Sequence, residues 1–205
     1  LNPAHAEPVT EFLDREFLAK LPATERAFLL QAALPPFVSG MLARDLTGVE
    51  QAAAILARFG REHLLISQYG QEQGAGSGNY QFHPILRDFL LLRLERDYPA
   101  DELKAMKIKA ARLLEAQREV ESAADLLIQA GAWDELGRLI CAHAAAWMGS
   151  SRVGPLRQWL EALPETVRTA DPWLLLWHGS VLRLFNPPAA RQPLAQAYQQ
   201  FMAQE

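Results

Sequence analysis

Apolar residues in the first part of the chain recur at the spacing of buried helix faces. From residue 10 to residue 34 they fall every three to four positions on both sides of Pro22, which predicts two helical segments. The second segment begins near Thr24 and stops at Pro35 and Pro36, because proline has no backbone N–H with which to continue a helix.

Two further short helices are expected next, joined by a tight turn. Ser39 has a side-chain oxygen that suits a helix N-cap and Gly48 suits the position after a helix end, so we expect one helix between them. A second helix is expected from Val49 to Phe59, ending at Gly60. Two short helices in this arrangement are typical of a helix-turn-helix.

The pattern then changes to two short apolar segments, EHLLISQYG and NYQFHP, around a glycine-rich turn, which predicts a β-hairpin. Pro84 takes the first position of a following helix, whose apolar stripe comprises Ile85, Leu86, Phe89, Leu90 and Leu94. Helices, a hairpin and a closing helix together predict a helical winged-helix domain over residues 1–98.

Residues 99–205 show only helical periodicity. Antiparallel pairs are expected at 101–118 with 121–130, 132–148 with 152–163, and 171–185 with 188–203, with small-residue and aromatic spacing similar to tetratricopeptide repeats. We therefore expect an α-solenoid here, truncated because its last pair lacks a polar cap. The predicted fold class is mainly α: a winged-helix domain with a small β-hairpin, followed by an antiparallel helix-pair α-solenoid.

The charge distribution argues against a nucleic-acid surface. Residues 1–98 carry 9 basic and 12 acidic side chains, and residues 99–205 carry 11 and 12. The presumed recognition helix, VEQAAAILARFGREH, offers few phosphate partners, so we expect no direct DNA binding by this chain. No apolar run is long enough to cross a membrane and no signal-peptide pattern is present, so we expect a cytoplasmic protein without a membrane partner.

Motifs for catalysis are absent from the sequence. The glycine run GAGSGNYQF lacks the lysine of a phosphate-binding P-loop and leads into a strand, and neither HExxH nor GxSxG occurs. The single Cys141 is interpreted as a buried small hydrophobe, and Asp134 with Glu135 as first-turn helix charges. We expect no catalytic residue, no metal site and no cofactor within these residues, and therefore no enzyme.

One histidine is a candidate for binding an anion. His83 lies directly before Pro84, where the hairpin becomes a helix, so its imidazole lies beside the positive end of a helix dipole. The ring could donate a hydrogen bond to an anion. The alternative is a histidine that caps or packs this corner.

The five tryptophans all lie in the predicted solenoid. Trp173 and Trp177 share one helix face, and packing between helices is one explanation for them. The other is an aromatic surface, formed by Trp173, Trp177 and Trp147, that binds a ligand or partner. His143 and His178 are expected to pack on apolar helices.

Ordered blocks of the sequence resemble the MalT-like, ATP-dependent LuxR-type transcriptional regulators, which are signal-transduction NTPases with numerous domains. The resemblance extends over about residues 10 to 185, and the blocks FHPILRDFL and RQWLEALPE are its most distinctive parts. It implies a longer polypeptide with an N-terminal P-loop ATPase, a winged-helix segment, a superhelical sensor and a C-terminal DNA-binding domain. This chain corresponds to the second segment and the start of the third.

The resemblance also implies a role for His83. In related ATPases a Met-His-Asp motif occupies this corner, and its histidine contacts the β-phosphate of ADP in the resting state. Here Phe82 replaces the methionine and Pro84 replaces the aspartate, so any carboxylate contact is lost. His83 would sense nucleotide bound to the ATPase domain of the same polypeptide, with ATP or ADP as ligand of the parent protein.

The resulting hypothesis is a regulatory fragment that couples the ATPase's nucleotide state to an inducer or regulatory protein bound by the solenoid. The alternative is a stand-alone tetratricopeptide-like protein-interaction adaptor with a winged-helix module.

Overall fold

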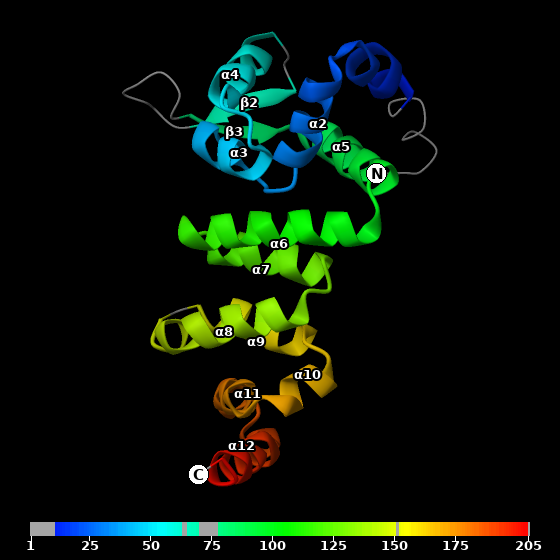
Figure 1. Ribbon diagram of the computed structural model, residues 1–205. Helices are drawn as coiled ribbons and strands as arrows, with labels where there is room; N and C mark the ends of the chain where they lie inside the picture. Colours follow the sequence, from blue (N-terminus) through cyan, green and yellow to red (C-terminus); the bar gives the residue numbers. More distant parts are fainter. Residues whose placement is uncertain (1–10, 63–64, 70–77, 151, 205) are drawn as a thin grey trace. The chain divides into compact units, whose positions relative to one another are not determined.

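The computed structural model describes residues 11–62, 65–69, 78–150 and 152–204. The chain divides into two compact units, unit 1 over Leu1–Gln117 and unit 2 over Arg118–Glu205 (Figure 1). The predicted domain boundary after residue 98 stays a prediction. The glycine-rich turn predicted near residues 70–77 lies outside the described residues.

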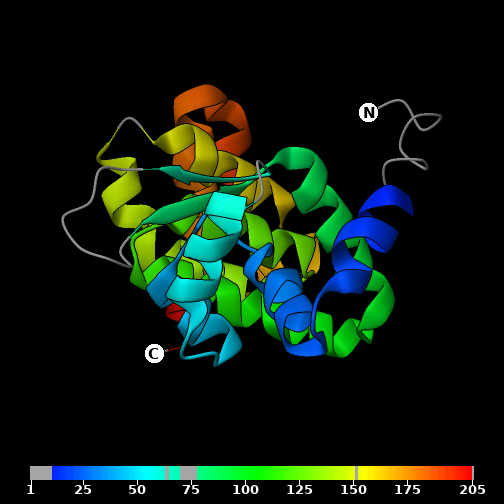
Figure 2. The same cartoon turned by 90° about the horizontal axis from the view of Figure 1, so that it is seen from above.

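Unit 1 begins with irregular helical turns and a regular helix. η1 (Leu13–Phe17) is π-helical and η2 (Leu18–Lys20) is a 3-10 turn, and they are followed by α2 (Ala23–Ala32). The segment around η1 lies beside α5 (Pro84–Asp97), as Figure 2 shows, and Arg93 of α5 forms an ion pair with Asp14 at 3.1 Å.

A three-stranded antiparallel sheet and two short helices form the centre of unit 1. The strand order is β1 (Val38–Ser39), β3 (Asn79–Phe82), β2 (Ile66–Tyr69), and the predicted hairpin is therefore present as β2 and β3. α3 (Gly40–Thr47) contacts β1 and α4 (Ala52–Glu62) contacts β2. The Ser39 hydroxyl accepts the backbone N–H of Leu42 at 3.1 Å, which confirms the predicted N-cap.

The expected bounds of one helix in this region were wrong, and one strand was not predicted. α4 begins at Ala52 and continues through Gly60 to Glu62, whereas the predicted helix ran from Val49 and ended at Gly60. Gly60 allows α4 to pack closely against the Tyr80 ring, since a Cβ at this position would lie 3.3 Å from the ring. The sequence pattern also missed β1, because two residues are too few to show alternation.

The core of unit 1 comes from every one of these elements. α5 follows the sheet, and α6 (Ala100–Ala116) ends the unit. The fully buried side chains include Phe28, Leu29, Leu42, Leu56, Phe59, Phe82, Leu86, Leu90 and Leu94. The expected stripe of α5 is thus buried at Leu86, Phe89, Leu90 and Leu94, while Ile85 is half-buried.

Unit 2 consists of helices in the described residues. They are α7 (Val120–Gln129), α8 (Trp133–Met148), α9 (Val153–Ala162), α10 (Glu165–Ala170), α11 (Pro172–Phe185) and α12 (Pro187–Met202). α8 packs against α7 and α9, and α11 packs along α12. The winged-helix unit and these stacked helices confirm the predicted fold class; the short α10 was not predicted.

Candidate functional site

His83 is held at a fixed corner between strand and helix. The preceding Phe82 is buried at the end of β3, and Leu86 is buried in the first turn of α5. The backbone N–H of His83 donates to the carbonyl of Leu65 at 2.7 Å. These contacts fix the backbone on both sides, so the orientation of the imidazole is restricted.

The imidazole of His83 caps α5 and also reaches solvent. Its Nδ1 accepts the backbone N–H of Ile85 at 3.3 Å, and the side chain is exposed. A neutral imidazole that accepts through one nitrogen carries its proton on the other. The geometry therefore shows the helix cap, while anion binding through Nε2 stays a prediction.

Two neighbouring groups cannot donate to an anion at this corner. Pro84 has no backbone N–H, although it occupies the first turn of α5. Arg87, one turn further on, donates from Nε to the carbonyl of Ala33 at 3.0 Å and from a terminal nitrogen to Leu34 at 2.8 Å. Burial lowers the pKa of the Arg87 guanidinium below its ordinary value.

The three tryptophans of the expected ligand surface have different surroundings. Trp147 is buried, with its ring 4.6 Å from that of Trp159. Trp177 is half-buried, and its indole nitrogen has no hydrogen-bond partner among the described residues. Trp173 is 53% exposed and packs edge-on against Phe201 at 5.1 Å. Their role in binding a ligand or partner stays a prediction.

Other candidate groups have ordinary surroundings. Burial, with a smaller contribution from the charge of Asp171, raises the pKa of Cys141 to about 11, so the thiol is protonated at neutral pH and a poor nucleophile. His178 is half-buried, and its pKa is lowered by that burial and by Arg168. In the described part of the chain, no cluster of His, Cys, Asp and Glu has the form of a metal site. Nor is any helix there sufficiently long and apolar to span a bilayer.

Sequence reasoning missed two features that the structure forms from distant segments. Arg87 joins α5 to the end of α2, and nothing in its local pattern indicates this role. Asp134 does lie in the first turn of α8, as expected, but it also lines a pocket with residues of α10 and α11. Local sequence patterns cannot indicate this pocket, because the residues of α8 and those of α10 and α11 that line it are about 30 positions apart in the chain.

Comparison with known proteins shows which family the segment around His83 resembles. Residues 14–102 match the family model of the MalT winged helix domain, and this range includes His83. The first half of the chain is therefore similar to the winged helix domain of MalT. The chain is 28% identical over 173 residues to the HTH-type transcriptional regulator MalT of Klebsiella pneumoniae strain 342, and equally similar to MalT of a second strain, K. pneumoniae subsp. pneumoniae.

The extent of the match matters for function. Each alignment covers 84% of this chain but only 18% of the relative, so the chain spans less than a fifth of the length of these regulators. The matched winged-helix range lies within unit 1.

Proposed function

We propose that this chain is the winged-helix and α-solenoid part of a MalT-like, ATP-dependent transcriptional regulator of the LuxR type. Unit 1 would respond to the nucleotide held by a P-loop ATPase domain of the same polypeptide, and unit 2 would bind an inducer or regulatory protein. The similarity to two MalT regulators along 84% of the chain supports this assignment.

The observation that carries the proposal is the exposed imidazole of His83 at the N-terminus of α5. Its Nδ1 is occupied by the Ile85 N–H, so Nε2–H is available to donate to a phosphate oxygen. The positive end of the helix dipole favours an anion at the same place. A resting state with ADP bound would be stabilised by this contact.

Coupling then follows from differential affinity. A ligand shifts a conformational equilibrium only by the difference between its affinities for the two states. If the ADP state is held by His83 and the inducer binds unit 2 better when that contact is released, each ligand weakens the binding of the other. A coupling of about 1–3 kcal/mol is ordinary for such systems.

The experiment uses the product of the complete reading frame and measures ADP affinity and transcription. His83→Ala removes both the cap and the donor, whereas His83→Asn keeps a good N-cap acceptor and removes the imidazole. We expect both variants to lose about 10- to 100-fold in ADP affinity, the equivalent of a hydrogen bond to a charged group, and to activate transcription without inducer.

Other outcomes would contradict the proposal. Unchanged ADP affinity in both variants removes His83 from the mechanism, and a loss in His83→Ala alone assigns it only the cap of α5. A reading frame with no GxxxxGK[ST] segment upstream would favour the stand-alone adaptor.

A further inference from the structure

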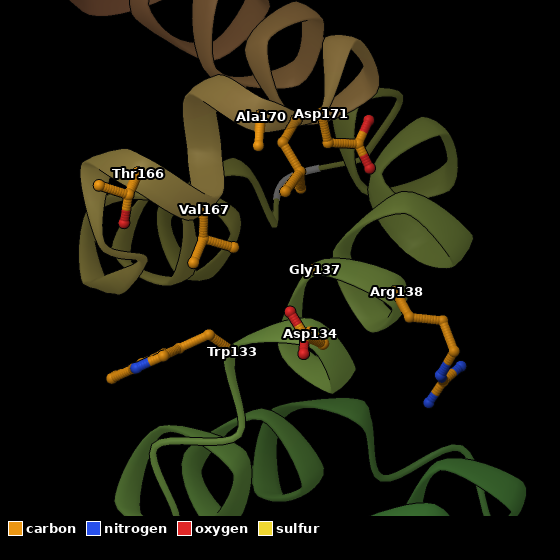
Figure 3. Close-up of a pocket in the computed structure, with 9 residues that line it drawn as sticks. Trp133, Asp134, Gly137, Arg138, Thr166, Val167, Ala170 and Asp171 are labelled. Atoms are coloured by element: carbon orange, nitrogen blue, oxygen red, sulfur yellow. The ribbon is translucent and has the colours of Figure 1, made fainter.

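Unit 2 has a pocket between the first turn of α8 and the short helix α10. Its volume is about 450 Å³, within the usual range for ligand sites. Trp133 and Asp134 of α8 face Val167 and Ala170 of α10 across the opening, and Asp171 lies where α11 begins (Figure 3). Leu174 of α11 adds a buried apolar wall.

The backbone around the pocket is shaped by two glycines. Gly131, in the turn before α8, has φ of 56°, a conformation that favours glycine, and the Trp133 ring lies near it. Gly137 lies one turn into α8, where a Cβ would come within 3.2 Å of Leu174 Cδ1. These close approaches bring α11 against α8 and hold the indole at the edge of the pocket.

The charge of the pocket is negative by about one unit. Asp134 is exposed, and no cation pairs with it among the described residues. Asp171 uses Oδ1 to accept the Trp173 N–H at 2.8 Å, and Arg138, the lining cation, pairs with Glu135 at 3.3 Å. The N-termini of α8 and α11 each contribute about half a positive charge, so two carboxylates leave roughly one negative charge uncompensated.

This charge and the apolar walls define the ligand chemistry. An anion would be repelled, whereas a single organic cation matches the charge. A guanidinium can pair with a carboxylate through two parallel N–H donors and stack on an indole, while an ammonium is a more strongly hydrated point charge. Asp134 and Trp133 are adjacent residues at the start of α8, and both line the pocket.

We propose that this pocket binds an arginine side chain of a partner polypeptide. The guanidinium pairs with Asp134 and stacks on Trp133, and the aliphatic stem packs against Val167 and Leu174. Asp134, Thr166 and Ala170 are exposed, so the site is open along one side. An open site accepts a side chain carried by a protein, whereas small metabolites are usually enclosed over most of their surface.

This inference deepens the partner-binding role proposed for unit 2 and depends on it. The two can fail separately, because a regulatory protein could bind elsewhere on unit 2 without using this pocket. Nucleotide sensing by His83 does not enter the experiment.

The test is a titration of the ¹⁵N-labelled 205-residue chain, followed by two-dimensional NMR. The probes are the capped peptide Gly-Ala-Arg-Ala-Gly, the same peptide with glutamine in place of arginine, and free arginine amide. We expect the arginine peptide to shift the Trp133 indole and the Gly137 and Ala170 amides in a saturable way. The glutamine peptide should leave these signals in place.

Two variants separate the pocket from general charge attraction. Asp134→Asn should weaken arginine-peptide binding about tenfold, as expected for loss of a charge-assisted hydrogen bond. Glu165→Gln removes the same charge from an exposed position in the first turn of α10, outside the pocket, and should bind as the unaltered chain does.

Four outcomes would overturn the inference. The first is the absence of saturable shifts up to about 10 mM peptide, an affinity well below that of any specific contact. The second is an equal loss of arginine-peptide affinity in Asp134→Asn and Glu165→Gln, and the third is equal affinity for the glutamine and arginine peptides. The fourth is that arginine amide binds as tightly as the arginine peptide. The last result would assign the pocket to a small molecule.

Discussion

Glycine residues in unit 2 differ in what an added methyl group would meet. At Gly179 of α11 a Cβ would lie 2.6 Å from Leu194 Cγ and 3.2 Å from the Leu194 backbone nitrogen. At Gly154 of α9 no atom outside the adjacent residues and the backbone of the same helix lies within 4 Å of the same position. The absence of a side chain at Gly179 therefore sets how closely α11 and α12 approach, whereas a Cβ at Gly154 would contact no other helix among the described residues.

We predict unequal effects of alanine at these two positions. Gly179→Ala should lower the free energy of unfolding of unit 2 by about 1–3 kcal/mol, because α12 must move away from α11. Gly154→Ala should change it by less than about 1 kcal/mol, because the gain in helix propensity is opposed by the clash of the new Cβ with the ring of Pro155. Denaturant unfolding monitored by tryptophan fluorescence measures this directly, since all five tryptophans lie in unit 2. Equal effects of the two substitutions would contradict the close approach.

Long cationic side chains complete the C-terminal ends of neighbouring helices. Arg87 of α5 donates to the carbonyls that follow α2, and Lys109 of α6 donates to the Leu46 carbonyl of α3 at 2.7 Å. In unit 2, Arg168 of α10 donates to the carbonyls of Leu160 and Leu163 at the end of α9. These contacts satisfy carbonyls that a helix leaves unpaired, and they join elements that are separated in sequence.

Removal of Arg87 should loosen α5 from α2. We expect Arg87→Ala to destabilise unit 1 by about 2–3 kcal/mol, since two carbonyls lose a charged donor. The stability of Arg87→Lys should lie between those of the unaltered chain and Arg87→Ala, because an ammonium cannot donate to both carbonyls with the geometry of a guanidinium. Arg96→Ala, at an exposed position in the last turn of α5, is the control. Hydrogen exchange of the buried amides of α2 reports the change, and equal exchange in Arg87→Ala and Arg96→Ala would refute it.

Local signals account for the elements that the sequence predicted well. The N-cap at Ser39, the αL glycine at Gly48 and the proline at the start of α5 act within one helical turn, so they are visible in the sequence. The passage of α4 through Gly60 depends instead on Tyr80 from a different strand. Likewise, the position of His83 at an exposed corner was predictable, but the retention of Arg87 by α2 and the pocket beside Trp133 depend on distant segments.

At the scale of the whole molecule, unit 1 has a winged-helix fold but offers little positive charge for a DNA backbone. Arg58 of α4 pairs with Glu25 at 2.6 Å and lies 3.9 Å from Glu62. Arg44 of α3 pairs with Asp45 at 2.9 Å. Arg61 of α4 is exposed, and the formal net charge of the chain is −4. A fold that often reads DNA therefore occurs here with two of the three arginines of α3 and α4 paired with carboxylates.

This pairing sets the expected behaviour with duplex DNA. Binding strength depends on the number of phosphates neutralised, and the logarithm of the association constant falls with the logarithm of salt concentration by about 0.9 per phosphate. Because Arg61 is the arginine of α3 and α4 without an ion pair among the described residues, we expect a slope near −1 to −2 and dissociation constants no tighter than about 1 µM, independent of sequence. Fluorescence anisotropy with labelled duplexes at increasing salt measures both quantities. Nanomolar, sequence-selective binding with a steep slope would show that the ion pairs of Arg44 and Arg58 open on DNA, and the winged helix would then be a DNA reader in its own right.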